Sequence, residues 1–138
     1  MINIALKPDA QRPGFYILQD IHSLPESLRQ SARPHVWTPP TDVFETEDAI
    51  IVRVEIAGML ENDFSIVLDG RYLSIRGMRS DVPERRAYHQ MEIRFGEFAT
   101  DVELPHPVSV SEIEAVYSSG FLQVRLPKAR PVKVSVEE

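Results

Sequence analysis

Alternating apolar and polar residues run through the middle of the chain, and this period of two predicts β-strands with one buried face. Residues 49–57 show it most clearly, because four aliphatic residues fall on one face and charged residues on the other: Ile50, Val52, Val54 and Ile56 face inward. Similar faces recur over residues 64–68, 73–75 and 98–104, and Asp69-Gly70 predicts a hairpin between the first two. Gly77 is expected to end the second strand of that hairpin. The pattern predicts an all-β domain.

A second hairpin is predicted over residues 115–128. One strand ends near Tyr117, a tight turn passes through residues 118–120, and a second strand covers residues 121–126. Gly120 sits where a three-residue hairpin loop requires a left-handed residue, which glycine adopts without steric cost. Pro127 lacks a backbone donor and is expected to end the strand.

Prolines divide the chain into regions. Six of the eleven lie within the first forty residues, and none lies between Thr41 and Val82. Because proline is excluded from central strands, continuous sheet is expected only after the first forty residues. We therefore expect an arm over residues 1–35, a β-domain over residues 36–128, and a short extension over residues 129–138.

The arm carries an apolar cluster formed by Phe15, Tyr16, Ile17 and Leu18. Apolar residues continue at helical spacing from there, and a short helix is expected over residues 26–31, so the arm is predicted to be partly helical or disordered. An arm of this length cannot bury the cluster alone. The cluster either packs on its own domain or forms a surface for other subunits or partners.

A long connection over residues 78–97 separates two predicted strands. It contains a strand-forming segment with no clear partner in the sequence: Tyr88, His89, Gln90, Met91, Glu92 and Ile93. Connections of this length inside a compact β-domain are uncommon and usually functional. The segment either folds as a flap over its own domain or pairs with the sheet of another chain.

The extension alternates Val132, Val134 and Val136 with Lys133 and Ser135, after a proline. Alternating β-branched residues at a free end could add as a strand to an exposed groove or edge of another subunit. The alternative is a frayed tail.

The chain carries little that points to catalysis or to a cofactor. The four histidines lack the short spacings of metal sites, there is no cysteine, and no glycine-rich phosphate loop is present. His106, between two prolines, is expected to be an exposed loop residue, and Glu45 with Glu47 to be solvated charge. We therefore expect no enzyme activity, no metal and no cofactor.

Charge and hydropathy limit which partners and which cellular compartment are expected for the protein. The net charge of −6 argues against nucleic acid as the main partner, since phosphate binding rests on a basic face. No apolar run approaches a transmembrane span, and the N-terminus lacks the features of a signal peptide. These observations favour a cytoplasmic protein.

Three separated blocks of residues together resemble the α-crystallin domain of small heat-shock proteins, over residues 36–128. The most specific block matches the family's A-x-x-x-n-G-v-L signature and its closing V-x-L-P-K through Ala115, Gly120, Phe121, Leu122, Val124, Leu126, Pro127 and Lys128. A second block is similar in Tyr88-His89, Glu92-Ile93-Arg94, Gly96, Phe98, Leu104 and Pro105. The third comprises V-E-I-A-G at residues 54–58 and L-S-I-R-G at residues 73–77.

The resemblance implies an immunoglobulin-like β-sandwich of two antiparallel sheets that dimerises and then forms larger homo-oligomers. It implies an ATP-independent holdase chaperone whose partners are partly unfolded client proteins. The long insert suits the bacterial, archaeal and plant type, in which a strand of this loop, here residues 88–93, swaps into the partner's sandwich. The family's terminal I-x-I/V motif maps onto Val134 and Val136, with Val132 and Val134 as an alternative register.

One departure from the family concerns Thr100, which stands where an arginine involved in dimer contacts is frequent. The resemblance therefore implies a dimer interface held in another way. Client contacts are expected at Phe15, Tyr16, Ile17 and Leu18. Two other classes remain open: a p23-like β-sandwich co-chaperone that docks as a monomer on a folded partner, and a carbohydrate-binding or adhesive sandwich.

Overall fold

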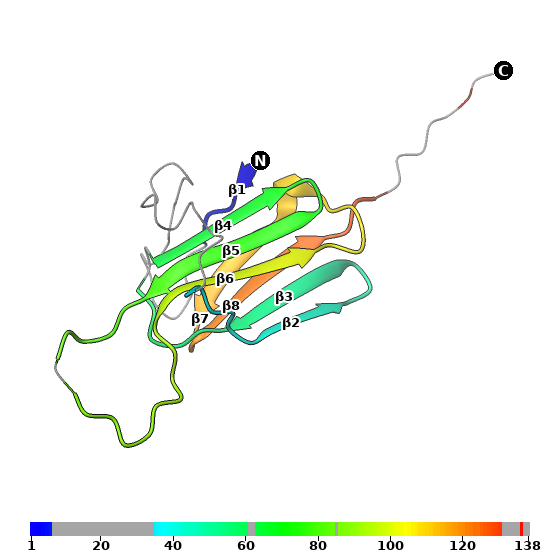
Figure 1. Ribbon diagram of the computed structural model, residues 1–138. Helices are drawn as coiled ribbons and strands as arrows, with labels where there is room; N and C mark the ends of the chain where they lie inside the picture. The colour runs from blue at the N-terminus through cyan, green and yellow to red at the C-terminus, as the bar shows by residue number, and fades with distance from the viewer. Residues whose placement is uncertain (7–34, 61–62, 85, 131–135, 137–138) are drawn as a thin grey trace.

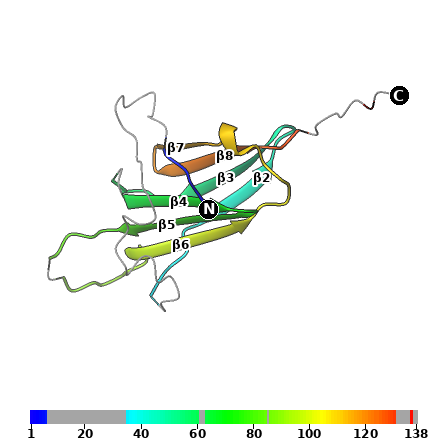
Figure 2. The same cartoon turned by 90° about the horizontal axis from the view of Figure 1, so that it is seen from above.

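The computed structural model describes residues 1–6, 35–60, 63–84, 86–130 and 136. Two four-stranded antiparallel sheets pack face to face, as Figures 1 and 2 show from two directions. One sheet has the order β1-β4-β5-β6 and the other β2-β3-β8-β7. The strands are β1 (Ile2–Asn3), β2 (Thr41–Glu45), β3 (Ala49–Glu55), β4 (Phe64–Asp69), β5 (Tyr72–Arg79), β6 (Gly96–Glu103), β7 (Glu114–Ser118) and β8 (Phe121–Pro127). The predicted all-β sandwich of two antiparallel sheets is confirmed.

The core forms where the apolar faces of the two sheets meet. The inward residues expected on β3 are fully buried, and those expected on β4, β5 and β6 are buried with them. Phe64 and Phe98 meet edge to face at 6.1 Å between ring centroids, and Trp37 lies 5.8 Å from Phe98. The alternation of the sequence therefore identifies the core side of each long strand correctly.

Gly77 does not end its strand, contrary to expectation. β5 continues to Arg79, and Gly77 lies opposite Phe64 on one side and Phe98 on the other. A Cβ at this position would overlap the Asp63 carbonyl oxygen and lie 2.5 Å from Cζ of Phe98. Glycine is needed here because the neighbouring strands leave no room for a side chain.

The turn between β7 and β8 is shorter than predicted. Ser118 pairs with Phe121, so only Ser119 and Gly120 form the loop, with φ angles of 53° and 83°. Two consecutive left-handed residues are typical of a type I′ hairpin turn, whose twist matches that of the flanking strands. The expected three-residue loop is wrong, although the left-handed Gly120 is confirmed.

β1, at the start of the chain, was not predicted from the sequence. Ile2 and Asn3 pair with Leu68 and Val67 at the edge of β4, and Ile4 N donates a hydrogen bond to Ile66 O at 2.8 Å. The alternation of Ile2, Ile4 and Leu6 before Pro8 carried this information. The prolines that follow led us to expect an arm without sheet over the whole of residues 1–35.

Candidate functional site

The loop between β5 and β6 projects from one end of the sandwich (Figures 1 and 2). It holds all six residues of the predicted swap segment, and none of them lies in a strand of the single chain. All six are exposed, with Met91 at 62% and Ile93 at 65%. A strand-forming segment therefore stands clear of both sheets with its apolar side chains in solvent.

The base of this loop is held closed by Arg79, the last residue of β5. Its guanidinium donates to the Arg94 carbonyl oxygen, at 2.8 Å from Nε, and a second bond from Nη2 reaches the same oxygen. The guanidinium also lies over two aromatic rings, 4.6 Å from the centroid of Trp37 and 5.4 Å from that of Phe95. These contacts fix where the loop leaves the domain.

A polar cluster organises the first half of the loop. Arg86 Nη1 lies 3.2 Å from the Tyr88 hydroxyl and 3.4 Å from Asp81 Oδ1, and the Tyr88 hydroxyl donates to Asp81 Oδ2 at 3.3 Å. The hydrogen bond with Tyr88 and the charge of Asp81 raise the pKa of Arg86 above its usual range. Beyond Tyr88 the side chains of Met91 and Ile93 line a hollow on the loop itself.

Within the described ranges, no strand pairs with the outer edge of β2. Thr46 N donates to Ala49 O at 2.8 Å and Glu55 N donates to Pro40 O at 3.0 Å, which sets the register of the hairpin between β2 and β3. Because N–H groups along a strand alternate between its two edges, the N–H of Val43 points away from β3. Among the described residues, no backbone hydrogen bond is made along that outer edge.

The other sheet edges are at least partly covered. Trp37 lies along β6, where its N–H donates to Glu97 O at 3.0 Å and its carbonyl accepts from Ala99 N at 2.9 Å. Leu6 bridges to Ala115 on β7, and β1 covers β4. Among the sheet edges formed by described residues, the outer edge of β2 is therefore the most accessible to a further strand, with exposed Val43 and Phe44 beside it.

Four residues of the family signature lie within the packed hairpin of β7 and β8: Ala115, Gly120, Leu122 and Pro127. Ala115 and Leu122 are fully buried, and Pro127 is buried where β8 ends. Gly120 packs against Ala57, whose Cβ lies 3.3 Å from where a Cβ of residue 120 would stand. Its carbonyl also accepts a hydrogen bond from Ile56 N at 2.8 Å. These residues hold the hairpin in place.

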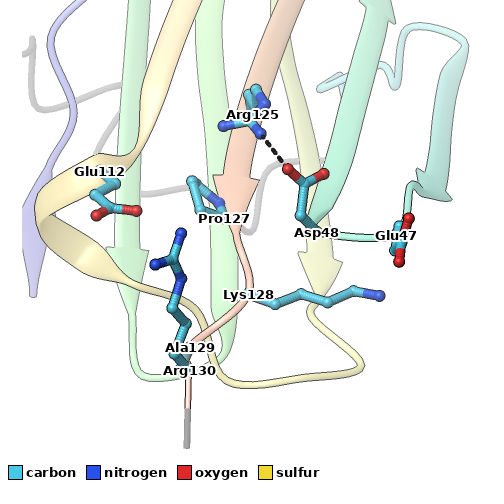
Figure 3. A pocket seen from close by; sticks show the side chains of 8 residues that line it. All are labelled: Glu47, Asp48, Glu112, Arg125, Pro127, Lys128, Ala129 and Arg130. Atoms are coloured by element: carbon cyan, nitrogen blue, oxygen red, sulfur yellow. Dashed lines mark hydrogen bonds and ion pairs between the residues drawn. The ribbon is translucent and has the colours of Figure 1, made fainter.

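A charged hollow lies where β8 passes into the extension (Figure 3). Within it, Arg125 Nη2 contacts Asp48 Oδ2 at 3.4 Å, as the dashed line marks. Three acidic and three basic side chains line the hollow: Glu47, Asp48, Glu112, Arg125, Lys128 and Arg130. The hollow therefore carries charges of both signs and is not a site of one charge.

Glu45 and His106 are exposed, as expected, and they also form a polar contact that was not predicted. His106 Nε2 lies 2.9 Å from Glu45 Oε1, and Lys128 Nζ lies 3.1 Å from the same oxygen. The hydrogen bond from Lys128, together with the charges of both neighbours, lowers the pKa of Glu45. Lys128 Nζ also donates to Thr46 O at 3.1 Å, so the group ties β2 to the end of β8.

Thr100 faces the interior. Its side chain is buried, and its hydroxyl lies 3.0 Å from that of Thr41. That the dimer interface is held in another way than by an arginine at this position stays a prediction.

Several predicted site residues lie outside the described residues. These are the arm cluster Phe15, Tyr16, Ile17 and Leu18, and Val132 and Val134 of the extension. Val136 is described and is 85% exposed. Across the described ranges, no group of three or more possible metal ligands is found, and no helix there is long and apolar enough to cross a membrane.

Comparison with known proteins finds similarity to small heat-shock proteins. A model of the Hsp20/alpha crystallin family matches residues 42–137. Small heat shock protein C2 of Rickettsia felis is 30% identical over 92 residues, 65% of this chain and 60% of that protein's length. Heat shock protein 16.0 from Schizosaccharomyces pombe has a TM-score of 0.63 at 26% identity, covering 78% of this chain and 81% of that one. A small heat-shock protein from Xylella fastidiosa has a TM-score of 0.61 at 25% identity, covering 74% and 98%.

Proposed function

The chain belongs to the Hsp20/alpha crystallin family, and from this membership we propose that it is an ATP-independent holdase chaperone. It would bind partly unfolded proteins and suppress their aggregation. The physical basis is mass action, because a binder of the partly unfolded state depletes the species that aggregates. The observation that carries the proposal is the match of the family model to residues 42–137, together with a sandwich fold shared with solved small heat-shock proteins.

We propose that residues 88–93 and the outer edge of β2 meet in a homodimer. Residues 88–93 of one copy would add as a strand to the outer edge of β2 in the partner, where the N–H of Val43 is available. Pairing would bury side chains such as Met91 and Ile93, which the single chain leaves in solvent. An open edge strand invites such pairing, and a reciprocal exchange would cover both edges at once.

Val43→Pro tests this pairing directly. Proline removes the outward N–H and blocks the approach of a partner strand, while the hydrogen bonds from β2 to β3 remain. The matched control is Val43→Thr, which keeps the N–H and the β-branched shape. Size-exclusion chromatography with light scattering should show monomers for Val43→Pro and dimers or larger species for the control.

Deletion of residues 88–93 supplies the complementary test. If the segment is the swapped strand, the deletion should produce a monomer with an unchanged β-sheet spectrum. A dimer that survives both changes would reject the exchange and favour the flap.

Larger oligomers are proposed to form through the extension. Val134 and Val136 would dock as alternate residues of an added strand, with Val132 as the alternative register. The solved structure of the Xylella fastidiosa relative is described as having a distinct high order structure, which supports assembly beyond the dimer. Val134→Gly combined with Val136→Gly should reduce large species to dimers. An oligomer mass that does not change would reject this role for the extension.

Client capture is proposed to use the arm cluster of Phe15, Tyr16, Ile17 and Leu18 and the apolar groove that the extension would otherwise occupy. The test is an aggregation assay with a heat-labile client and no nucleotide, at increasing ratios of chain to client. Light scattering should fall as the ratio rises. Absence of protection at excess chain would overturn the holdase proposal.

The alternative is a p23-like co-chaperone that docks on a folded partner. Such a module would be a monomer at working concentration, and its activity would not depend on residues 88–93. A clean monomer that gives no protection in the aggregation assay would favour this alternative.

A further inference from the structure

Arg79 lies where β5 and β6 separate. It pairs with Gly96, the first residue of β6, and this is the last pair of the ladder before the long loop. The loop returns to the sheet through Arg94 and Phe95, and Ile93, the last residue of the predicted swap segment, directly precedes them. The contacts that hold Arg94 therefore set the direction in which residues 88–93 leave the domain.

The Arg79 guanidinium contacts this return point and the domain around it. Nε donates to the Arg94 carbonyl oxygen at 2.8 Å, and Nη2 donates to the same oxygen. The guanidinium lies 4.6 Å from the ring centroid of Trp37 and 5.4 Å from that of Phe95. Nη1 donates to the Ala57 carbonyl oxygen at 3.4 Å. One side chain thus joins the end of the loop to the segment of Trp37 and to the residues that follow β3.

Trp37 is a fixed support for this contact. Its indole Nε1 donates to Gly96 O at 3.4 Å, its backbone N–H donates to Glu97 O at 3.0 Å, and its carbonyl accepts from Ala99 N at 2.9 Å. Its ring is buried in the core. Because the ring is held by the sheet, a cation that rests on it is held as well.

A second arginine of the same kind lies at the other end of β5. Arg71 donates to the Leu104 carbonyl oxygen from Nε at 2.9 Å and from Nη2 at 2.7 Å. Both arginines therefore hold one carbonyl oxygen with two donors, a geometry that the guanidinium fork favours. Only Arg79 holds a residue next to the predicted swap segment, so the two positions separate loop direction from general stability.

We infer that Arg79 is a positioning residue for the dimer, because it holds residues 88–93 in the direction in which they meet the β2 edge of a partner. The inference rests on the proposed exchange of that segment and names the residue that prepares it. None of the six residues lies in a strand of the single chain. The polar cluster around Arg86 shapes the first half of the loop, and Arg79 fixes the end of the second half. A segment that is ordered before binding gains affinity, since the cost of ordering it does not fall on the complex.

The expected effect follows from the fraction of chains whose segment points correctly. If loss of the guanidinium leaves about one segment in ten in the competent direction, the affinity of that segment falls about tenfold. A reciprocal exchange uses two segments, so the affinity of the dimer falls by up to about a hundredfold.

Arg79→Met in the full chain tests the inference. Methionine keeps an apolar stem and removes the donors and the charge. Sedimentation velocity over a dilution series gives the concentration at which half of the chains are monomers. This concentration should rise by about tenfold to a hundredfold relative to the natural chain. Arg79→Lys keeps a cation but lacks the fork of two donors, so with about half of the segments competent the rise should be about fourfold.

Arg71→Met is the matched control. It removes two similar bonds from the other end of β5 and leaves the loop untouched. The urea midpoints of Arg79→Met and Arg71→Met, measured where the chains are monomers, should fall by similar amounts. The half-dissociation concentration should change for Arg79→Met and stay at the natural value for Arg71→Met.

Three results would overturn the inference. These are a natural half-dissociation concentration in Arg79→Met, an equal rise in Arg71→Met, and, should Arg79→Met not fold, a natural value in Arg79→Lys. A natural chain that stays monomeric at every concentration would reject the proposed exchange together with the inference. A natural dimer that is insensitive to Arg79→Met would reject the inference and leave the exchange standing. Client protection on the same samples tests the holdase proposal separately.

Discussion

Gly77→Ala should be one of the most damaging single-methyl changes in this domain. Gly77 occupies the middle of β5, which is itself paired on both sides, so the strand cannot move away from an added atom. The methyl would overlap the backbone carbonyl of Asp63 and approach Cζ of Phe98 to 2.5 Å. A backbone carbonyl cannot rotate aside as a flexible side chain would, so the adjustment must move a strand or a buried ring.

The expected cost follows from overpacking. Extra methylenes in a well-packed core usually cost about 1–3 kcal/mol. Against this stands a gain of about 0.4–1 kcal/mol, because alanine restricts the unfolded chain more than glycine does. The contact with the backbone puts Gly77→Ala near the upper end, so we expect a net loss of about 2 kcal/mol. At a urea slope of about 2 kcal/mol/M, the unfolding midpoint should fall by about 1 M.

Tryptophan fluorescence during urea unfolding measures this loss. The chain has a single tryptophan, Trp37, whose ring lies 5.8 Å from that of Phe98, next to the added methyl. The control is Gly58→Ala, because a Cβ there meets nothing within 4 Å and only its φ of 76° is unfavourable. That strain alone costs about 1–2 kcal/mol and should leave the fluorescence of folded Trp37 unchanged. A neutral or stabilising Gly77→Ala would refute the close packing around β5.

Three further changes probe the hairpin and the charged group beside it. Tyr117→Phe removes the hydrogen bond that the hydroxyl donates to Ile56 O at 2.8 Å, and thermal unfolding should show a loss of about 1 kcal/mol. Ser119→Asn should stabilise the domain by about 0.5 kcal/mol, since asparagine tolerates the left-handed φ of 53° better than serine does. Lys128→Met should raise the lowered pKa of Glu45 towards its ordinary value, as followed by NMR titration of the carboxyl carbon. Because the folded-state pKa of Glu45 is lowered, its contribution to stability is present above the ordinary glutamate value and is lost as the pH falls through the folded value. Lys128→Met should therefore flatten the decline of the free energy of unfolding at acidic pH. An unchanged pH profile would show that the contact between Lys128 and Glu45 does not contribute to stability.

The sequence predicted the parts of the fold that depend on local pattern. A period of two identifies the buried face of a strand from neighbours alone, so β3 with its inward Ile50 and Val54 could be recognised directly. The left-handed Gly120 was also predicted from local pattern, because a glycine between two strands is typical of a hairpin turn. The loop length was not, because Ser118 and Ser119 are chemically alike and only the register against Phe121 separates strand from turn.

Features that depend on strand order were beyond the sequence. Gly77 looks like a strand end until β4 and β6 are placed on either side of it. Glu45 and His106 are 61 positions apart, and only the folded sheets bring them to 2.9 Å. For the candidate site, the role of residues 88–93 was predicted from the sequence and stays a prediction, whereas the accessible edge of β2 could not be predicted. Whether a strand lies at an edge is a property of the whole sheet.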